Sequence, residues 1–404
     1  MSNNSRIVSI SGNPVSGKST VVNKIIEKLK EKGFSDENIH LISTGTMFRK
    51  YFNKLMSLIS NIDNKEKMIE NSKDTDIKRI LRNPTYREKV RDLCISLKQS
   101  GINPKEFDIA NANTSQELGS IRHIIDEIVD SEMADLGKQI VEKNNPDEVW
   151  IIDSRLAFHN IPESFAVRLT VRDKVAAERL FNDTSRGKED SNYKSLEEAE
   201  KKVIERKHGE QERYKRRYEI DLEDQDNYNL IIDTSYADID EIADTILKCA
   251  ERDREGKEYP KNWDSPKVFV PTQSVRDTWG MSWSTMMTFE DIKDSIKNDG
   301  YDLSMPIEIV EADGIMYLFE GHHRNFASAM AGKTLIPYKK FRRYSDEASK
   351  KFTKDIKPVY LFDHEPAFDE KKEDGTKITF SYQDIYPNIY NILMRPENPD
   401  QQEL

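Results

Sequence analysis

A glycine-rich stretch near the start of the chain carries the residue types that bind phosphate. Residues 12–19 read Gly-Asn-Pro-Val-Ser-Gly-Lys-Ser, with the apolar run 7–10 before them and an amphipathic segment, residues 20–32, after them. In such a loop the glycines let successive backbone N–H groups point at one anion, and the lysine reaches the outer phosphates of a nucleoside triphosphate. The stretch therefore predicts a strand, a phosphate-binding loop and a helix, in that order.

The loop residues have distinct predicted roles. Lys18 is predicted to be catalytic, because a fixed cation stabilises the charge that develops on a transferring phosphoryl group. The Ser19 hydroxyl is predicted to be a ligand of Mg2+. A chance glycine-rich turn is the alternative, but it would not account for the flanking strand and helix. The residues predicted to bind the donor nucleotide are Gly12, Ser16, Gly17, Lys18, Ser19 and Thr20.

Polar residues also follow later apolar runs of the N-terminal half. Arg49 lies one turn into a helix predicted after the run 39–42, and Asp153 and Arg155 follow the run 149–152. Because apolar strands alternate with helical segments here, the pattern predicts a parallel sheet with helices on both faces. Ligands of such sheets bind at the carboxyl ends of the strands, so we expect these residues to share one crevice with the lysine of the loop.

Four motifs, in this order, resemble a cytidylate kinase of the nucleoside monophosphate kinase superfamily, in its archaeal-type branch. They are GNPVSGKS, STGTMFR, IIDSRLA and the charged segment IERKHGEQERYKRRYE, and the resemblance spans roughly residues 5–250. It implies an α/β fold with a P-loop parallel sheet, and a kinase that uses ATP and Mg2+.

The same resemblance implies roles for arginines and for one carboxylate. Arg49 and Arg155 would bind the phosphate of the acceptor monophosphate, and Asp153 would lie near Mg2+ through a water molecule. A mobile lid would bring further arginines over the transferring phosphoryl group, where catalysis consists mostly of positioning and charge stabilisation. The arginines that match the lid segment are Arg206, Arg213, Arg216 and Arg217.

Each of these assignments has a plainer alternative. The lid arginines also fit the solvated surface of a charged helix, since acids and bases recur there at helical spacing. Arg49 and Arg155 could form surface salt bridges. Asp153 could cap a helix that begins at Ser154.

The chain departs from the family pattern between the second and third motifs. A segment of about a hundred residues, about 50–146, replaces a much shorter monophosphate-binding insertion and reads as several helices with polar joints. It lies where the acceptor base would be recognised. Asp126 and Asp130 are candidates to contact the acceptor, although carboxylates on a helix more often face solvent.

The pattern changes in the C-terminal half. The charged segment 255–266 contains Gly and Pro and predicts a linker between a kinase domain, residues 1–254, and a second domain, residues 267–404. An Asp-Gly pair at 313–314 between alternating apolar runs predicts a hairpin. About residues 266–343, with PIEI and EGHHR in the family's order, resemble the ParB/sulfiredoxin-like fold, which implies a smaller α+β domain.

In that superfamily a G-x-x-R turn holds phosphate at a helix N-terminus, and its members bind CTP, act on DNA or transfer phosphate. A second phosphate site is therefore expected here, and the histidines and the arginine would add donors for an anion. The histidines could instead cap the junction of hairpin and helix, and the glutamate is either a base or a hairpin-end residue. The predicted residues are Glu320, Gly321, His322, His323 and Arg324.

Composition limits the remaining possibilities. The chain has 404 residues and a formal net charge of -11, which argues against a surface that attracts nucleic acid everywhere. A basic stretch at 339–343 leaves a local contact with nucleic acid through the C-terminal domain open. There is no apolar run of the roughly 20 residues that a membrane helix needs, and the two cysteines, Cys94 and Cys249, form no metal or disulfide pattern. We expect a cytoplasmic protein without a membrane partner, whose oligomeric state the sequence leaves open.

Three functions fit these observations. The first is an ATP- and Mg2+-dependent phosphotransferase that converts a (deoxy)cytidine monophosphate or a related acceptor into the diphosphate. The second is a kinase that phosphorylates another hydroxyl, on a small molecule such as serine or on a modified nucleotide or DNA. The third is a nucleotide-regulated DNA-binding or nuclease module. The acidic charge and the lack of an obvious recognition helix weigh against the third.

Overall fold

The computed structural model describes residues 6–51, 119–182, 193–272, 289–312, 314–340, 366–371 and 377–381. These residues form a mixed α/β fold whose main strands are mostly parallel. They divide into two compact units. One holds the chain up to Ser11 together with Leu29–Ala166, and the other holds Gly12–Lys28 together with the chain from Val167 onwards.

The first unit contains three parallel strands, β1 (Arg6–Gly12), β2 (Ile39–Ser43) and β3 (Val149–Asp153), in the order β2-β3-β1. Ser43 of β2 pairs in register with Asp153 of β3, so these two strands end side by side. A helix runs from residue 44 to residue 51, where this described stretch stops.

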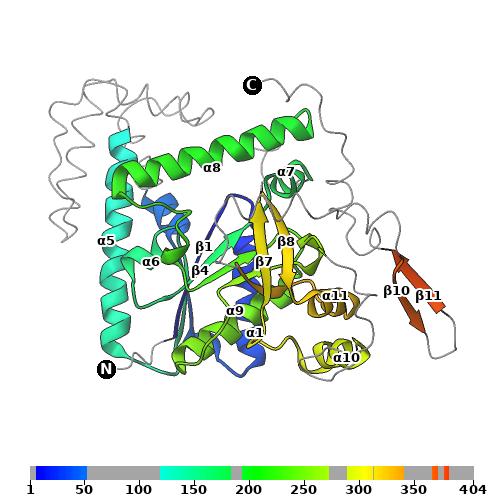
Figure 1. Cartoon of the computed structure of the whole chain (residues 1–404). Coiled ribbons are helices and arrows are strands. Elements are labelled where there is room, and N and C mark those ends of the chain that lie inside the picture. The colour runs from blue at the N-terminus through cyan, green and yellow to red at the C-terminus, as the bar shows by residue number, and fades with distance from the viewer. Residues whose placement is uncertain are drawn as a thin grey trace, which may run out of the picture. The chain divides into compact units, whose positions relative to one another are not determined.

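A long helix, α5 (Gly119–Lys143), packs against the short helix α6 (Ala157–Asn160) in this unit, as Figure 1 shows. Met133 of α5 and Ile161 are fully buried in their shared core. A Cβ at Gly137 would lie 2.8 Å from Cγ1 of Ile161, so a glycine is what permits the close approach. Helix α5 accounts for the last part of the predicted insertion 50–146, whose residues 52–118 lie outside the described chain.

The second unit contains six strands in the order β4-β5-β6-β9-β7-β8. Neighbouring strands are parallel except for the pairs β6 with β9 and β7 with β8. The hairpin predicted around Gly314 is confirmed by the antiparallel pairing of β7 and β8. The strands are β4 (Phe165–Thr170), β5 (Leu230–Asp233), β6 (Asn262–Asp264), β7 (Ile307–Ala312), β8 (Ile315–Glu320) and β9 (Ile336–Lys340).

Strand β6 lies inside the segment 255–266, for which the sequence predicts a linker. It pairs with β5 on one side and with β9 on the other, and Trp263 and Asp264 are both buried. The strand has only three residues, and charged residues and prolines surround it in the sequence, so the sequence shows no strand pattern here. Strand pairing therefore continues from β5 to β9, and the proposed boundary between two domains stays a prediction.

Six helices of the second unit are described. Helix α8 packs against α7 (Figure 1), and Ala176 and Val203 are buried in the cluster that the two helices share. Lys28 of α1 donates to Asp244 of α9 at 2.9 Å and joins those two helices. The helices are α1 (Lys18–Glu31), α7 (Asp173–Asn182), α8 (Leu196–Tyr218), α9 (Ile239–Arg254), α10 (Phe289–Asp299) and α11 (His322–Met330).

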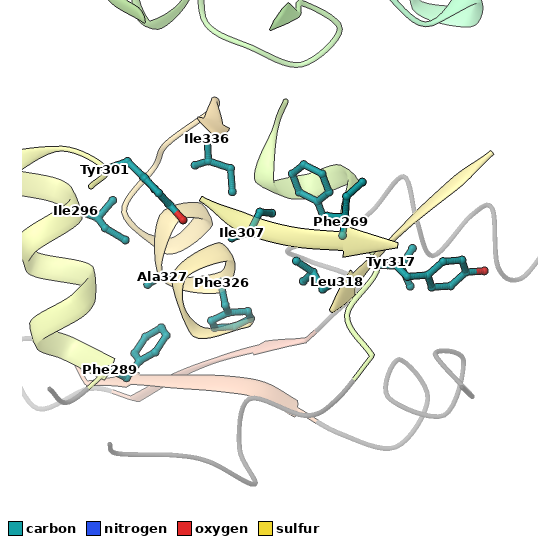
Figure 2. Close-up of a cluster of buried hydrophobic side chains, with 12 residues drawn as sticks. Phe269, Phe289, Ile296, Tyr301, Ile307, Tyr317, Leu318, Phe326, Ala327 and Ile336 are labelled. Carbon is teal, nitrogen blue, oxygen red and sulfur yellow. The ribbon is translucent and has the colours of Figure 1, made fainter. Parts of the chain in front are cut away.

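A separate apolar core lies beneath strands β7 to β9 (Figure 2). Phe326 of α11 is fully buried and meets Phe289 of α10 with ring centroids 5.7 Å apart. Phe269 packs against Tyr338 of β9 at 5.4 Å, in the tilted geometry that aromatic pairs prefer. This core fixes α11, and with it the glycine turn at which α11 begins.

Two further strands, β10 (Pro366–Lys371) and β11 (Lys377–Ser381), form an antiparallel pair of their own. No helix in the described part of the chain is long and apolar enough to cross a membrane. The last three residues of the basic stretch 339–343 lie outside the described chain.

Candidate functional site

The loop between β1 and α1 has a backbone that only particular residues allow. Gly12 has φ 157°, and a Cβ there would lie 2.4 Å from the carbonyl oxygen of Leu169 in β4. The Asn13 N–H donates to that same carbonyl at 3.0 Å. The loop therefore starts in tight contact with β4, which any side chain at position 12 would prevent.

The far end of the loop is open where the beginning is crowded. Gly17 has φ 79°, and a Cβ there would meet no atom within 4 Å. Val15 also takes a positive φ, 62°, which is unfavourable for a β-branched residue. Backbone held in this way exposes N–H groups at a helix N-terminus, which is the arrangement that binds phosphate.

The predicted donor-binding side chains lie around this loop. Lys18 donates to the Gly12 carbonyl at 3.2 Å, so its ammonium folds back over the loop. Ser19 and Thr20 are exposed in the first turn of α1. The Ser16 hydroxyl is buried, and it has no hydrogen-bond partner among the described residues. A buried polar atom without a partner, beside an open glycine, fits a loop that accommodates phosphate oxygens.

A second layer of side chains supports the loop from the ends of β4 and β5. The Thr234 hydroxyl donates to the Ser16 carbonyl at 3.1 Å. Arg179 of α7 donates to the Val15 carbonyl at 3.4 Å and to the Thr234 hydroxyl at 3.2 Å. These bonds satisfy two loop carbonyls and turn them away from the face where an anion would bind.

Arg168, a residue to which the sequence analysis gave no role, is buried in β4 and holds the start of the loop. Its guanidinium donates to the Asn13 side chain at 3.1 Å and to Glu223 at 2.6 Å. It also donates to the Leu222 carbonyl and lies over the Tyr228 ring. Arg168 thus joins the loop to the segment that follows helix α8. A charged residue inside an otherwise apolar strand was the signal that could have found it.

A cluster of charges lies where β4, β5 and β6 end. Arg172, just beyond β4, donates to Asp233 of β5 at 2.7 Å and to Asp264 of β6 at 2.9 and 3.3 Å. Asp264 is buried, and desolvation together with the charge of Asp233 raises the pKa of Asp264 to about 7, against the opposing effect of Arg172. The sequence analysis missed Arg172 and Asp264, because their distance along the chain gives no sign that they pair.

The four predicted lid arginines all lie on α8. Arg206 is exposed and forms an i,i+4 pair with Glu210 at 3.6 Å. Arg213 and Arg217 lie over the rings of the tyrosines that follow them, at 4.8 and 4.9 Å from the ring centroids, and Arg216 is exposed. The helix is anchored by its first half, where Ala199 and Val203 are buried. In its second half Arg216 is exposed while Arg213 and Arg217 are half-buried, and both the lid role and the alternative of a charged surface helix stay predictions.

In the first unit, Asp153 and Arg49 belong to one hydrogen-bonded group at the ends of β2 and β3. The Ser43 hydroxyl donates to the Asp153 carboxylate at 3.4 Å and accepts from the Thr46 N–H at 3.4 Å. Arg49 donates to the Thr46 hydroxyl at 3.1 Å. Asp153 does not cap a helix, since α6 begins only at Ala157.

The other predicted acceptor-side residues are placed as follows. Arg155 lies half-buried in the turn before α6. Asp126 and Asp130 lie on α5 and are half-buried, so neither is simply solvent-facing. Asp130 accepts from the Asn160 amide at 3.1 Å, which ties α5 to α6. No role in acceptor binding is tested by these contacts.

The EGHHR turn joins β8 to α11. Gly321 has φ 94°, and Arg324 folds back to donate to the carbonyls of Met305 and Pro306. His322 is buried, and its Nε2 accepts from the Thr272 N–H at 3.3 Å. Desolvation lowers the pKa of His322 to about 4, so this ring is neutral near pH 7.

His323 is the second residue of α11 and is half-buried, and Glu320 lies 3.8 Å from Arg324. The turn has the left-handed glycine that the phosphate-site prediction requires. Its arginine already has backbone partners, and the second phosphate site stays a prediction.

The loop offers one hydroxyl that fits a metal bound mainly by substrate phosphates. The described residues contain no group of three or more His, Cys, Asp or Glu side chains that could hold a metal ion by itself. Mg2+ in phosphoryl-transfer sites is bound by one or two protein groups together with substrate phosphates. The exposed Ser19 hydroxyl at the end of the loop fits that mode of binding.

Comparison with known proteins gives partial matches. No family model matches the chain. It is 31% identical over 116 residues to a cytidylate kinase from Methanosphaera stadtmanae, which covers 29% of this chain and 62% of that protein. It is 32% identical over 104 residues to an S-adenosylmethionine-dependent nucleotide dehydratase from Lacinutrix mariniflava, which covers 26% of this chain and 20% of that protein.

The matches thus span less than two thirds of either curated relative. Among solved structures, that of TT1252 from Thermus thermophilus aligns with 60% of this chain and 97% of its own, at 11% identity and a TM-score of 0.30. A likeness at that score carries no argument about this fold.

Proposed function

We propose that this chain is an ATP- and Mg2+-dependent phosphotransferase of nucleotide kinase type, with a (deoxy)cytidine monophosphate or a related nucleotide as acceptor. The observation that carries the proposal is the loop from Gly12 to Ser19. It combines an open glycine, a lysine folded over the backbone and a buried hydroxyl for which the described part of the chain offers no hydrogen-bond partner.

The partial similarity to a cytidylate kinase supports the same reading. Both curated relatives are named for reactions of nucleotides, which favours a nucleotide over serine as acceptor. The S-adenosylmethionine in the name of the dehydratase is a competing cofactor, so the binding experiments need to include it.

Different residues of the chain would have different roles in phosphoryl transfer. When bound, Mg2+ would supply positive charge against the nucleotide phosphates. The loop N–H groups would bind the donor phosphates, with Ser19 beside the metal and Lys18 against the transferring group. Arg206, Arg213 and Arg217 would supply cations from α8. Arg49 and Arg155 would bind the acceptor phosphate, while Asp126 and Asp130 are proposed acceptor contacts.

The experiment measures ADP formation from labelled ATP and Mg2+ with a panel of acceptors: CMP, dCMP, UMP, AMP, serine and a DNA oligonucleotide. We expect turnover with a cytidine monophosphate. Transfer to serine or DNA alone would favour the second function considered from the sequence. Calorimetry with ATP and with S-adenosylmethionine distinguishes the two cofactors.

Lys18→Ala is expected to lower turnover by about a hundredfold or more, because it removes the fixed cation beside the transferring group. Lys24→Ala is the matched control on the same helix, since Lys24 pairs with Glu27 at 2.8 Å and has no contact with the loop in the described chain. Near-normal turnover of a folded Lys18→Ala protein would contradict the proposal.

A further inference from the structure

Asp264 lies far along the chain from the phosphate-binding loop, yet a short series of contacts connects them. Arg172 binds Asp264 with both terminal nitrogens and Asp233 with one of them. Asp264 belongs to β6, which follows the segment that resembles a kinase. The side chain of Asp264 is only 4% exposed and that of Arg172 is 32% exposed, so solvent reaches this pair from the arginine side only.

Asp233 also forms hydrogen bonds at the turn that follows β5. Its carboxylate accepts from the Thr170 hydroxyl at 3.0 Å and from the Ser235 N–H at 3.0 Å. The Ser235 hydroxyl accepts from the Arg172 N–H at 2.8 Å, which closes a ring of bonds around the turn. Residues 233–235 are thus held by Thr170 and Arg172 at the end of β4, and Arg172 is in turn bound by Asp264 of β6.

That turn touches the loop directly. Thr234 lies between Asp233 and Ser235, and its hydroxyl lies 3.1 Å from the Ser16 carbonyl and 3.0 Å from the Thr170 carbonyl, so its one proton is shared between the loop and β4. Ser16 is the residue whose buried hydroxyl has no described partner, and it precedes the open Gly17. A displacement of the turn would therefore move the part of the loop that is predicted to face phosphate.

We infer that Asp264 is a positioning residue of the donor-nucleotide site, which it holds in place through Arg172, Asp233 and Thr234. The inference rests on the proposed function. It gives the C-terminal part of the second unit a role in donor binding that the kinase resemblance does not include. A buried charge deprived of one partner reorganises its surroundings, because the remaining groups must find new ones.

The test compares Asp264→Asn with the wild-type chain and with Glu308→Gln. Glu308 is a matched control. Its carboxylate also forms an ion pair with a cation on another strand, 2.7 Å from Lys339 of β9, but it does not belong to the Arg172 network. Calorimetry gives the affinity for ATP, and initial rates give KM for ATP and for the acceptor. We expect Asp264→Asn to weaken ATP binding about 5- to 150-fold, with the acceptor KM within about twofold of wild type.

A second measurement excludes a purely structural role. The titratable and charged groups that face Asp264 are Arg172, Asp233, Tyr236 and Tyr338, and burial raises the pKa of both tyrosines, so neither ionises near neutrality. Protonation of Asp264 near pH 7 weakens its bond to Arg172. Wild-type ATP affinity should therefore fall more steeply between pH 8 and pH 6 than that of Asp264→Asn, whereas Glu308→Gln should follow wild type.

If Asp264→Asn does not fold, Arg172→Lys is the substitute variant. A lysine keeps the charge but cannot bind both carboxylates in the same way. It should show the same selective loss of ATP affinity. If wild type binds ATP and both variants bind it equally well, the inference is wrong while the proposed function stands. If wild type binds no ATP, both are wrong.

Discussion

At the residue scale, the site depends on buried polar groups whose ionisation is set by their surroundings. Arg168 and Arg172 are charged and paired, Asp264 is half-protonated near neutrality, and His322 is neutral. Desolvation sets the states of Asp264 and His322, whereas the Arg172 guanidinium keeps its charge against desolvation because Asp264 and Asp233 pair with it.

His322 gives a prediction about acid stability. Its folded pKa of about 4 lies below the ordinary value of 6.5, so the unfolded chain binds more protons between these two values. The stability that depends on the neutral ring is complete above about pH 6.5 and is lost as the pH falls toward 4, by up to about 1.4 kcal/mol per pH unit. Asp264 acts in the opposite direction, because its raised pKa makes stability fall as the pH rises toward 7.

The measurement is urea unfolding of wild type and His322→Gln from pH 4.5 to 7.5. A glutamine can still accept from the Thr272 N–H, but it cannot ionise. The difference in unfolding free energy between the two proteins should change with pH in favour of His322→Gln as the pH falls. A difference that stays constant across this range would show that His322 is not buried as a neutral ring.

At the element scale, the loop is defined by one crowded and one open glycine. Gly12→Ala brings a Cβ against the Leu169 carbonyl, whereas Gly17→Ala meets open space but keeps an unfavourable φ. We expect Gly12→Ala to reduce stability by several kcal/mol, through steric overlap with a strand. Gly17→Ala should cost only about 1 kcal/mol of stability, but it should weaken ATP binding, because its methyl group occupies the space beside the phosphates.

Thermal unfolding and calorimetry with ATP separate these effects. Gly33→Ala is a control, since Gly33 also has a positive φ with open space around it and lies at the other end of α1. It should share the small stability loss of Gly17→Ala and keep wild-type ATP affinity. Equal ATP affinities for Gly17→Ala and Gly33→Ala would contradict the placement of phosphate at the loop.

Sequence patterns predicted individual strands and helices better than they predicted which strands pair. The strand before the loop, the helix after it and the strand that ends at Asp153 follow from local apolar patterns, and the structure has them. Strand β6 was not predicted, because three residues inside a charged segment show no hydrophobic periodicity. The ion pair of Arg172 and Asp264 was not predicted, because it depends on which strands become neighbours in the sheet.

At the scale of the whole molecule, the pairing order of the second unit connects the kinase-like segment to the C-terminal part. Strand β5 pairs with β6, and β6 pairs with β9, which in turn lies beside β7. Thr334, just before β9, also donates to Glu241 of α9 at 2.8 Å. The C-terminal part therefore contributes a strand and a buried carboxylate to the sheet that carries the loop, so we do not expect it to be a freely tethered appendage.

This continuity predicts how shortened chains behave. A chain that ends at residue 254 loses β6, so β5 gains an exposed edge and Arg172 loses the Asp264 carboxylate. Breaking a buried pair by removal of one partner costs about 3–5 kcal/mol, which corresponds to a fall in Tm of roughly 10 °C or more for a unit of this size. ATP affinity should fall with it, because the turn at residues 233–235 loses its support.

A chain that ends at residue 340 is the matched control. It keeps β6, β9 and the whole Arg172 network, and it removes the hairpin of β10 and β11 together with the segments around it. Differential scanning calorimetry and ATP titration of the two shortened chains and the full chain provide the comparison. We expect the chain ending at 340 to bind ATP as the full chain does. If the chain ending at 254 matches the full chain in both Tm and ATP affinity, strand β6 supports neither the sheet nor the loop, since Arg172 then needs only Asp233.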